Sequence, residues 1–201
     1  MTIERQWCGF IAGPEMEDIM VYAFLATGLE EVECLGVVDI LRRGGIEVKL
    51  VSVTGVPMVT GSHHITIQAD ALIEDVDISQ ADLLFLPGGI PGTPNLAACD
   101  TLCTWIKEFA AEGKGLAAIC AAPSVLGQLG LLEGKCATCY PGFEEQLMGA
   151  TVVGDGVVTD GNITTARGLG YAIDLGLELV KRLAGAEKAQ SIKDAIQYNY
   201  Q

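Results

Sequence analysis

Short, almost entirely apolar runs alternate along the chain with longer segments in which apolar residues recur every three or four positions. The short runs are typical of strands buried on both faces of a sheet, and the longer period is that of a helix packed on one face of such a sheet. The main strands are predicted at 20–26, 47–53, 82–86 and 116–119, and helices at 29–43, 100–112, 123–129, 171–184 and from there to about 198. Shorter strands are predicted at 135–138, 151–153, 157–159 and 163–165, with a hairpin over 59–67 that turns at Gly61–Ser62.

This alternation predicts an α/β fold with a mainly parallel sheet and helices on both faces. In open sheets of this kind the functional site lies at the carboxyl ends of the strands. The segments after Gly28, the loop around Gly89 and the segment at Cys120 are therefore expected to converge.

One cysteine, Cys120, lies between a predicted strand and a predicted helix that begins at Pro123. Alanines flank it, and small neighbours suit a sharp strand-to-helix turn that presents a single side chain. The N-terminus of the helix supplies free N–H donors and positive potential, which favour thiolate over thiol. The pattern indicates a nucleophile elbow with sulfur as the nucleophile, and an inert buried cysteine is the alternative.

The first predicted helix has almost no polar face, so most of it is expected to be buried. Asp39 can pair with Arg43 one turn further on, whereas Glu33 has no such partner. An unpaired carboxylate among apolar groups is costly, so Glu33 is expected to stay protonated or to serve a functional site. The alternative is that it reaches solvent beside Glu30 and Glu31 at the helix start.

The strand predicted at 82–86 ends in a segment rich in glycine and proline, 87–94. Glycines at this end of a strand let backbone N–H groups face a ligand, so Gly89 is a candidate oxyanion donor if Cys120 lies beside it. A plain wide turn is the alternative, and the common glycine-rich phosphate motifs do not occur.

Charge and composition exclude several classes of protein. The 201 residues carry 26 acidic and 12 basic side chains, a formal net charge of −14, which opposes binding to nucleic acid and to membrane surfaces. No apolar run reaches the length of a membrane span. We therefore expect neither a nucleic-acid nor a membrane partner.

Seven cysteines without the spacing of a disulfide scaffold fit a reducing cytoplasm best. Cys136 and Cys139 lie three apart in a predicted strand and would point to opposite faces, which disfavours zinc or a redox dithiol. His63 and His64, read as strand residues, would diverge in the same way. We expect no metal site and no cofactor.

Residues 1–19 do not follow the pattern of the rest of the chain. Their one apolar stretch, Trp7–Ala12, is too short for a secretion signal and is followed at once by acidic residues. We expect residues 1–19 to form an N-terminal extension outside the core and residues 20–201 to form a single domain.

Four segments occur in the order seen in the ThiJ/PfpI superfamily: Gly28–Glu33, Leu86–Gly89, Ala117–Pro123 and Thr164–Gly168. In combination these motifs are specific, and the resemblance extends from about Met20 to the C-terminus. The chain resembles most closely the branch of the parkinsonism-associated protein deglycase. The resemblance implies a flavodoxin-like three-layer sandwich, related to class I glutamine amidotransferases, that forms a homodimer.

The resemblance also implies roles for individual residues. Cys120 stands where the family has its reactive, oxidation-prone cysteine, and Glu33 where it has a protonated glutamate that hydrogen-bonds the sulfur. Gly89 and Ala121 stand where backbone N–H groups form the oxyanion pocket, and Arg167 is a further candidate for substrate binding. A neutral carboxylic acid that donates to a thiolate would lower the thiol pKa.

The chain departs from the family pattern at two positions. Some members use a histidine from the strand after the nucleophile helix, where this chain has Tyr140, a group that can position a substrate but is a poor base at neutral pH. In the protease branch a histidine follows the cysteine directly, where this chain has Ala121. Peptidase activity is therefore disfavoured.

Two functions are consistent with these residues. The first is a cofactor-independent cysteine enzyme of the glyoxalase or deglycase type, which converts a small carbonyl substrate, a 2-oxoaldehyde, into a 2-hydroxy acid through Cys120 and Glu33. The second is a redox-sensing or chaperone-like protein in which Cys120 is oxidised to the sulfinate and hydrogen-bonds to Glu33.

Overall fold

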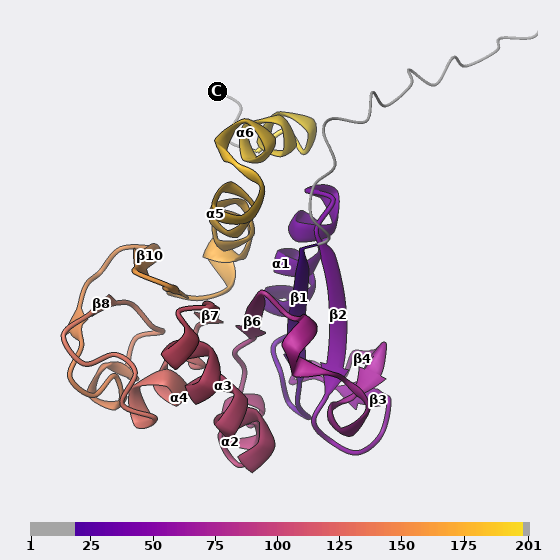
Figure 1. The fold of residues 1–201 in the computed structure, drawn as a ribbon, viewed down its shortest axis with the longest axis vertical. Helices are drawn as coiled ribbons and strands as arrows, with labels where there is room; N and C mark the ends of the chain where they lie inside the picture. The colour runs from indigo at the N-terminus through magenta and orange to yellow at the C-terminus, as the bar shows by residue number, and fades with distance from the viewer. Residues whose placement is uncertain (1–18, 199–201) are drawn as a thin grey trace, which may run out of the picture.

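The computed structural model describes residues 19–198, so the expected extension lies outside the described residues except for Ile19. Its centre is a seven-stranded sheet (Figure 1). In spatial order the strands are β10 (Val157–Asp160), β11 (Ile163–Ala166), β7 (Gly115–Ile119), β6 (Leu83–Leu86), β1 (Met20–Leu25), β2 (Glu47–Ser52) and β5 (Ala71–Leu72). All neighbouring pairs are parallel except β10 with β11, which confirms the mainly parallel sheet.

Helices cover both faces of this sheet. Along β1, Val21 and Leu25 pack into one apolar core and Tyr22 and Phe24 into the other, because successive strand residues point to opposite faces. The first core is closed by α1 (Glu31–Arg43), α5 (Ala172–Ala184) and α6 (Ala186–Ala195), and the second by α3 (Asp100–Glu112) and α4 (Pro123–Gln128). The predicted three-layer sandwich is confirmed.

Helix boundaries agree closely with the sequence pattern. The helix α3 spans the predicted residues and ends at Gly113, whose positive φ of 72° closes the last turn. In α1 the expected pair of Arg43 with Asp39 forms at 2.6 Å on the exposed face.

The smaller elements correct two predictions. The hairpin of β3 (Met58–Thr60) and β4 (Thr66–Gln68) forms as expected, but His63 and His64 lie in its turn and not in a strand. The loop after β6 is not a plain wide turn, because a short helix, α2 (Gly92–Ala97), begins within it. The remaining elements are a parallel pair, β8 (Cys136–Ala137) and β9 (Thr151–Val152), and single 3-10 turns at Ile73–Asp75, Ile78–Gln80, Glu144–Gln146 and Leu169–Tyr171.

The strand order reverses between β1 and β6, which lie side by side although more than fifty residues separate them in sequence. At such a point the loops after neighbouring strands lead away in opposite directions and leave room for a site. The segments after β1, β6 and β7 meet there, as predicted. Within the described part of the chain, no helix is long and apolar enough to cross a membrane.

Candidate active site

Cys120 occupies the predicted sharp turn between β7 and α4. Its φ of 64° is in the left-handed region, which is rare for a side chain other than glycine and marks a strained position. Hydrogen bonds on both sides hold this conformation: its N–H donates to Ala166 (2.9 Å) and its carbonyl accepts from Tyr140 (2.8 Å). The side chain is half-buried, so the elbow presents the sulfur at the end of the sheet without covering it completely.

Glu33 comes from the first turn of α1 and is 1% exposed. Its Oε2 atom is buried and has no hydrogen-bond partner within the described residues. A Cβ atom added to Gly88 would lie 2.5 Å from this oxygen and 2.6 Å from the Cβ of Cys120. The carboxyl group therefore reaches the cysteine across Gly88, in a space that only glycine leaves open. The alternative in which Glu33 extends into solvent is wrong.

Glu33 and Cys120 influence each other's titration. The pKa of Glu33 is raised from 4.5 to about 7, mainly by burial and also by the charge of Glu30. A hydrogen bond from the Cys120 thiol opposes this rise. Burial, followed by the charge of Glu33, raises the pKa of Cys120 to about 12. Because each negative charge disfavours the other, near neutral pH the pair carries a single negative charge at most.

This result corrects the prediction that the elbow lowers the thiol pKa. The N–H groups of Ala121 and Gly89 do act in that direction, but they offset only part of the burial and of the Glu33 charge. Helix α4 is also only six residues long, so its dipole is weak. Sulfur in the free protein is therefore mainly a thiol, and Glu33 is the nearest group that can accept its proton.

Gly89 and Ala121, the expected oxyanion donors, both direct backbone N–H groups toward the sulfur. Gly89 has a φ of 97°, which only glycine adopts easily, and its carbonyl accepts from Thr93 in the first turn of α2 (2.8 Å). The structure thus brings four predicted residues together, the two side chains and the two backbone donors.

Tyr140 and Arg167 lie further from the sulfur. Both line a shallow hollow of about 340 Å³ together with Gly168 and Leu169. A Cβ atom added to Gly168 would lie 3.3 Å from the Tyr140 ring and 3.9 Å from the carboxyl group of Glu33, so both side chains lie on the same side of Gly168. The Arg167 guanidinium donates to the carbonyl of Gly154 (2.8 Å), so it is held at the rim of the hollow.

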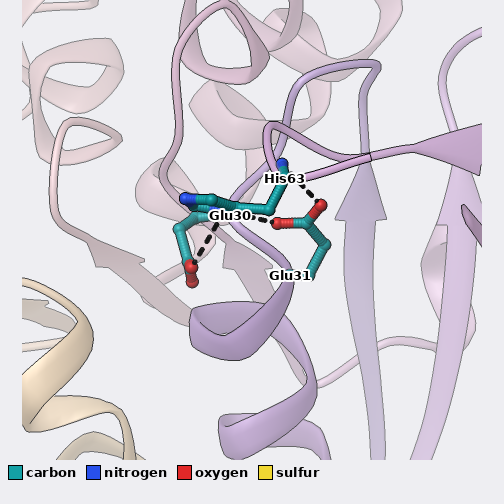
Figure 2. A group of neighbouring side chains, drawn as sticks. All are labelled: Glu30, Glu31 and His63. Atoms are coloured by element: carbon teal, nitrogen blue, oxygen red, sulfur yellow. Dashed lines mark hydrogen bonds and ion pairs between the residues drawn. The ribbon is translucent and has the colours of Figure 1, made fainter. Parts of the chain in front are cut away.

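A second cluster, not anticipated from the sequence, joins the start of α1 to the β3–β4 turn (Figure 2). Glu31 is 1% exposed, and its carboxylate accepts from the N–H of His63 (2.8 Å), the His63 ring (3.0 Å) and the N–H of Ile65 (3.2 Å). Burial alone would raise the pKa of Glu31, but these hydrogen bonds, with one from its own backbone, hold it below its ordinary value.

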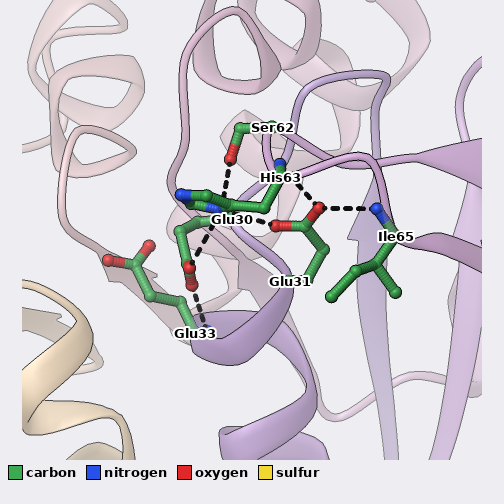
Figure 3. Close-up of polar contacts among 6 residues, drawn as sticks. All are labelled: Glu30, Glu31, Glu33, Ser62, His63 and Ile65. Carbon is green, nitrogen blue, oxygen red and sulfur yellow. Dashed lines mark hydrogen bonds and ion pairs between the residues drawn. The ribbon is translucent and has the colours of Figure 1, made fainter.

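Glu30 lies between this cluster and Glu33 (Figure 3). Its Oε2 accepts from the N–H of Glu33 at 2.5 Å and caps the helix, while its Oε1 lies 3.7 Å from the His63 ring nitrogen. Figure 3 also shows the Glu33 carboxyl turned away from His63. The expectation that Glu30 and Glu31 would reach solvent is wrong, because the β3–β4 turn covers them.

Glu30, Glu31 and His63 also bear on the question of a metal. Their ligand-type atoms lie within 4.8 Å of one another, and they form the one such group found in residues 19–198. However, the Glu31 carboxylate is already satisfied by three hydrogen bonds, so we assign the group as an ion-pair cluster and not as a metal centre. Cys136 is exposed in β8 and Cys139 is buried beyond the end of this strand, so the two cysteines differ in burial but do not share the strand in which they were predicted.

One feature of the sequence points to this cluster. Three glutamates in the first turn of a helix, without a basic residue one turn on, require partners from elsewhere in the chain. His63, in a turn between two short strands, is the cationic group that the fold places beside them.

Residues 19–182 match the DJ-1/PfpI family, and the chain belongs to it. Among its relatives, DJ-1 homolog B of Arabidopsis thaliana is 43% identical over 170 residues, which cover 84% of this chain and 39% of the relative. The chain thus spans only about two-fifths of the length of that plant protein. A glutathione-independent glyoxalase of Caenorhabditis elegans, DJR-1.2, is 31% identical over 165 residues, or 81% of this chain and 87% of the relative.

Solved structures agree with this assignment. The oxidized form of DJ-1 from Toxoplasma gondii superimposes with a TM-score of 0.87 at 34% identity and covers 90% of this chain and 100% of the other. The fold, the elbow and the family assignment are therefore mutually consistent.

Proposed function

We propose that the protein is a cofactor-independent cysteine enzyme that converts small 2-oxoaldehydes, such as methylglyoxal, into 2-hydroxy acids. The observation that carries this proposal is the contact between Cys120, on a strained elbow, and the buried carboxyl group of Glu33, whose pKa of about 7 suits proton transfer at neutral pH. The name of the Caenorhabditis relative, a glutathione-independent glyoxalase, supports the same reaction class.

The first step is addition of sulfur to the aldehyde carbon. As the S–C bond forms, the thiol proton passes to the Glu33 carboxylate, and the electron pair of the C=O bond moves onto oxygen. The N–H groups of Gly89 and Ala121 face this oxygen, which takes the proton back from Glu33; this gives a hemithioacetal and returns Glu33 to the carboxylate. Proton transfer to Glu33 during the attack avoids the need for a preformed thiolate.

The second step moves a hydrogen between neighbouring carbons. Glu33 removes the proton from the former aldehyde carbon, the ketone oxygen takes up a proton to give an enediol, and Glu33 then delivers its proton to the adjacent carbon, which becomes the hydroxyl-bearing carbon. The hydroxyl group of the former aldehyde carbon loses its proton as this carbon becomes the thioester carbonyl, which balances the proton gained by the ketone oxygen. One carbon is oxidised as the other is reduced, so no external redox partner is needed, and the product is a thioester of Cys120. Water then hydrolyses the thioester and restores the thiol. Action on glycated amines, in which the carbonyl compound is bound to an amine, would share these steps.

The test is lactate formation from methylglyoxal by the purified chain. We expect Cys120→Ala to reduce it to the uncatalysed background, and Cys136→Ala, at an exposed position in β8, to leave it unchanged. Lactate formation by the Cys120→Ala variant at the wild-type rate would refute the proposal.

A second candidate function is redox sensing, in which peroxide oxidises Cys120 to the sulfinate and Glu33 donates a hydrogen bond to it. The half-buried sulfur and the oxidized form solved for the Toxoplasma relative support this alternative. Peptide mapping by mass spectrometry after mild peroxide would test it. If Cys120 is the slowest of the cysteines to gain oxygen, the sensor function is excluded.

We also propose that the protein acts as a homodimer in a reducing compartment such as the cytoplasm. Large apolar side chains remain exposed on α1 and on the hairpin beside it, namely Val32 (52%), Leu35 (39%), Met58 (52%) and Ile65 (53%). All six cysteines of the described residues are free thiols, which supports a reducing compartment. Sedimentation equilibrium should give a mass twice that of one chain, and the Leu35→Glu variant should give a mass closer to that of one chain.

A further inference from the structure

Glu30 is a buried charge held in a fixed position next to the proposed catalytic pair. It is 8% exposed, its N–H donates to the carbonyl of Gly88 (2.9 Å), and its carboxylate accepts from the N–H of Glu33 (2.5 Å). Gly88 is the residue that separates Glu33 from Cys120. A charge shielded from solvent and fixed in this way acts on its neighbours with little screening by salt.

His63 is the counter-charge to Glu30 and lies at the surface. Its side chain is 67% exposed and bridges Glu31 at 3.0 Å and Glu30 at 3.7 Å. Its pKa is raised, first by the hydrogen bond to Glu31 and then by the Glu31 charge, so the ring is charged at and somewhat above its ordinary titration range. Glu33, Glu30 and His63 thus form a row from the buried site to solvent (Figure 3).

We propose that Glu30 and His63 are positioning residues of this site: the charge of Glu30 keeps the proton on Glu33, and protonated His63 weakens that effect. The inference rests on the proposed role of the Cys120–Glu33 pair. It adds a control of that pair by residues that touch neither the sulfur nor a substrate.

The other groups around Glu33 are neutral or already hydrogen-bonded, which leaves Glu30 and His63 as the charges that can change how tightly Glu33 holds its proton. On α1, Glu31 is saturated by hydrogen bonds and the pKa of buried Cys34 is raised to about 12, mainly by burial, so Cys34 stays neutral. Three residues of α5 that lie against α1, Ala172, Gly176 and Val180, are small or apolar. On the remaining side lie Cys120 itself, Tyr140, whose ring shares the space beside Gly168 with Glu33, and Arg167, whose guanidinium is bound to the Gly154 carbonyl.

The two charges are expected to have opposite effects on the reactivity of Cys120. The reactive form, thiolate with neutral Glu33, increases with pH until Glu33 ionises, and above that point its fraction stays constant. Removing the Glu30 charge makes Glu33 ionise at lower pH. The fraction of the reactive form then stops increasing at a lower pH, and its constant value is smaller. Removing the His63 charge does the reverse.

The experiment measures the rate at which iodoacetamide alkylates Cys120 between about pH 5 and pH 9. The Cys120 peptide is followed by mass spectrometry, because other thiols also react. In Glu30→Gln, which keeps an oxygen to cap the helix, we expect a plateau about tenfold lower, the change that corresponds to one pKa unit, with rates unchanged on the acidic limb. In His63→Gln, which keeps both backbone bonds to Glu31, we expect a rate at neutral pH about twofold higher.

Asp39→Asn is the matched control, because it also removes one negative charge from α1, at an exposed position paired with Arg43. It should leave the profile unchanged. A Glu30→Gln profile equal to wild type, an equal shift in Asp39→Asn, or slowing in His63→Gln would overturn the inference, and slowing at every pH would indicate only a structural role. Alkylation requires no turnover, so these shifts can appear even in a protein that makes no lactate, and the two proposals fail separately.

Discussion

Glu31 and Glu33 are two residues apart on α1 and equally buried, yet their environments have opposite consequences. Glu31 meets two backbone N–H groups and the His63 ring, and its pKa lies below its ordinary value. Glu33 faces Cys120 with one oxygen unpartnered, and its pKa rises to about 7. Both are 1% exposed, but burial outweighs the hydrogen bonds at Glu33, whereas the hydrogen bonds outweigh burial at Glu31. The balance between depth of burial and the supply of hydrogen-bond donors therefore decides which carboxyl group stays charged.

The difference separates a structural carboxylate from one suited to proton transfer. Glu31 fastens the β3–β4 turn to the start of α1, and its charge contributes to folding. At Glu33 the Cys120 thiol and the backbone N–H groups of Gly88 and Leu169 lower the pKa by less than burial raises it. An acid kept near its titration point in this way is suited to exchanging protons. Identical Glu→Gln substitutions at the two positions should therefore give opposite results.

The largest expected effect is that of Glu33→Gln on catalysis. Loss of the group that accepts and returns the proton should lower kcat/KM for methylglyoxal by about 10²–10⁴-fold. Steady-state measurement of lactate tests this, and a loss below tenfold would mean that another group transfers the proton.

The same variant should be more stable than wild type at high pH. A rise in the pKa of Glu33 from 4.5 to about 7 means that the folded state binds the proton more tightly, so wild type loses stability as pH rises across this window, by roughly 3 kcal/mol. Urea unfolding at about pH 5 and pH 8 should show Glu33→Gln gaining up to that amount at the higher pH only.

Glu31→Gln should instead destabilise the fold, by about 1.5–3 kcal/mol at neutral pH, because a charged acceptor of three hydrogen bonds is lost. The pKa of Glu31 is lowered, so wild type has this contribution above the ordinary glutamate range and loses it as pH falls through the folded value. The difference between variant and wild type should therefore shrink in acid. A variant as stable as wild type at pH 7 would contradict the structural role of Glu31.

Substitutions of two glycines, Gly61 beside Glu31 and Gly88 beside Glu33, test the same comparison. A Cβ at Gly61 would collide with the Glu31 carboxyl group, and one at Gly88 with Glu33 and Cys120. Gly61→Ala should cost about 1–2 kcal/mol in urea unfolding while Cys120 still reacts with iodoacetamide. Gly88→Ala should slow Cys120 alkylation strongly, and equal alkylation rates in the two variants would show that the surroundings of Glu31 and those of Glu33 are not independent.

Tyr140→Phe should have the smallest effect. The residue is 52% exposed and is tied to Cys120 through its backbone N–H, so loss of its hydroxyl should change kcat/KM by less than about threefold, under 1 kcal/mol of activation free energy. A much larger loss would make Tyr140 a catalytic residue.

Most of the fold could be predicted because local pattern and global packing agree. The apolar runs of β1, β6 and β7 are buried on both faces, and α3 begins and ends at the predicted residues because its apolar stripe stops at Gly113. The elbow could also be predicted, because Ala118, Ala121 and Ala122 are small residues close to Cys120 in the sequence and Pro123 marks the start of a helix. The helix α2 could not, since its glycines and prolines are those of a loop.

What the sequence alone determined is the order of strands and helices, the elbow at Cys120 and an unpaired acid at Glu33, all of which depend on residues close together in the chain. What only the tertiary structure decided is the charge state of these groups. The turn containing His63 covers Glu30 and Glu31, whereas Gly88 brings Glu33 to the sulfur without supplying enough donors to keep it ionised. A pKa depends on burial and on the donors within a few ångströms, and those neighbours come from segments far apart in sequence.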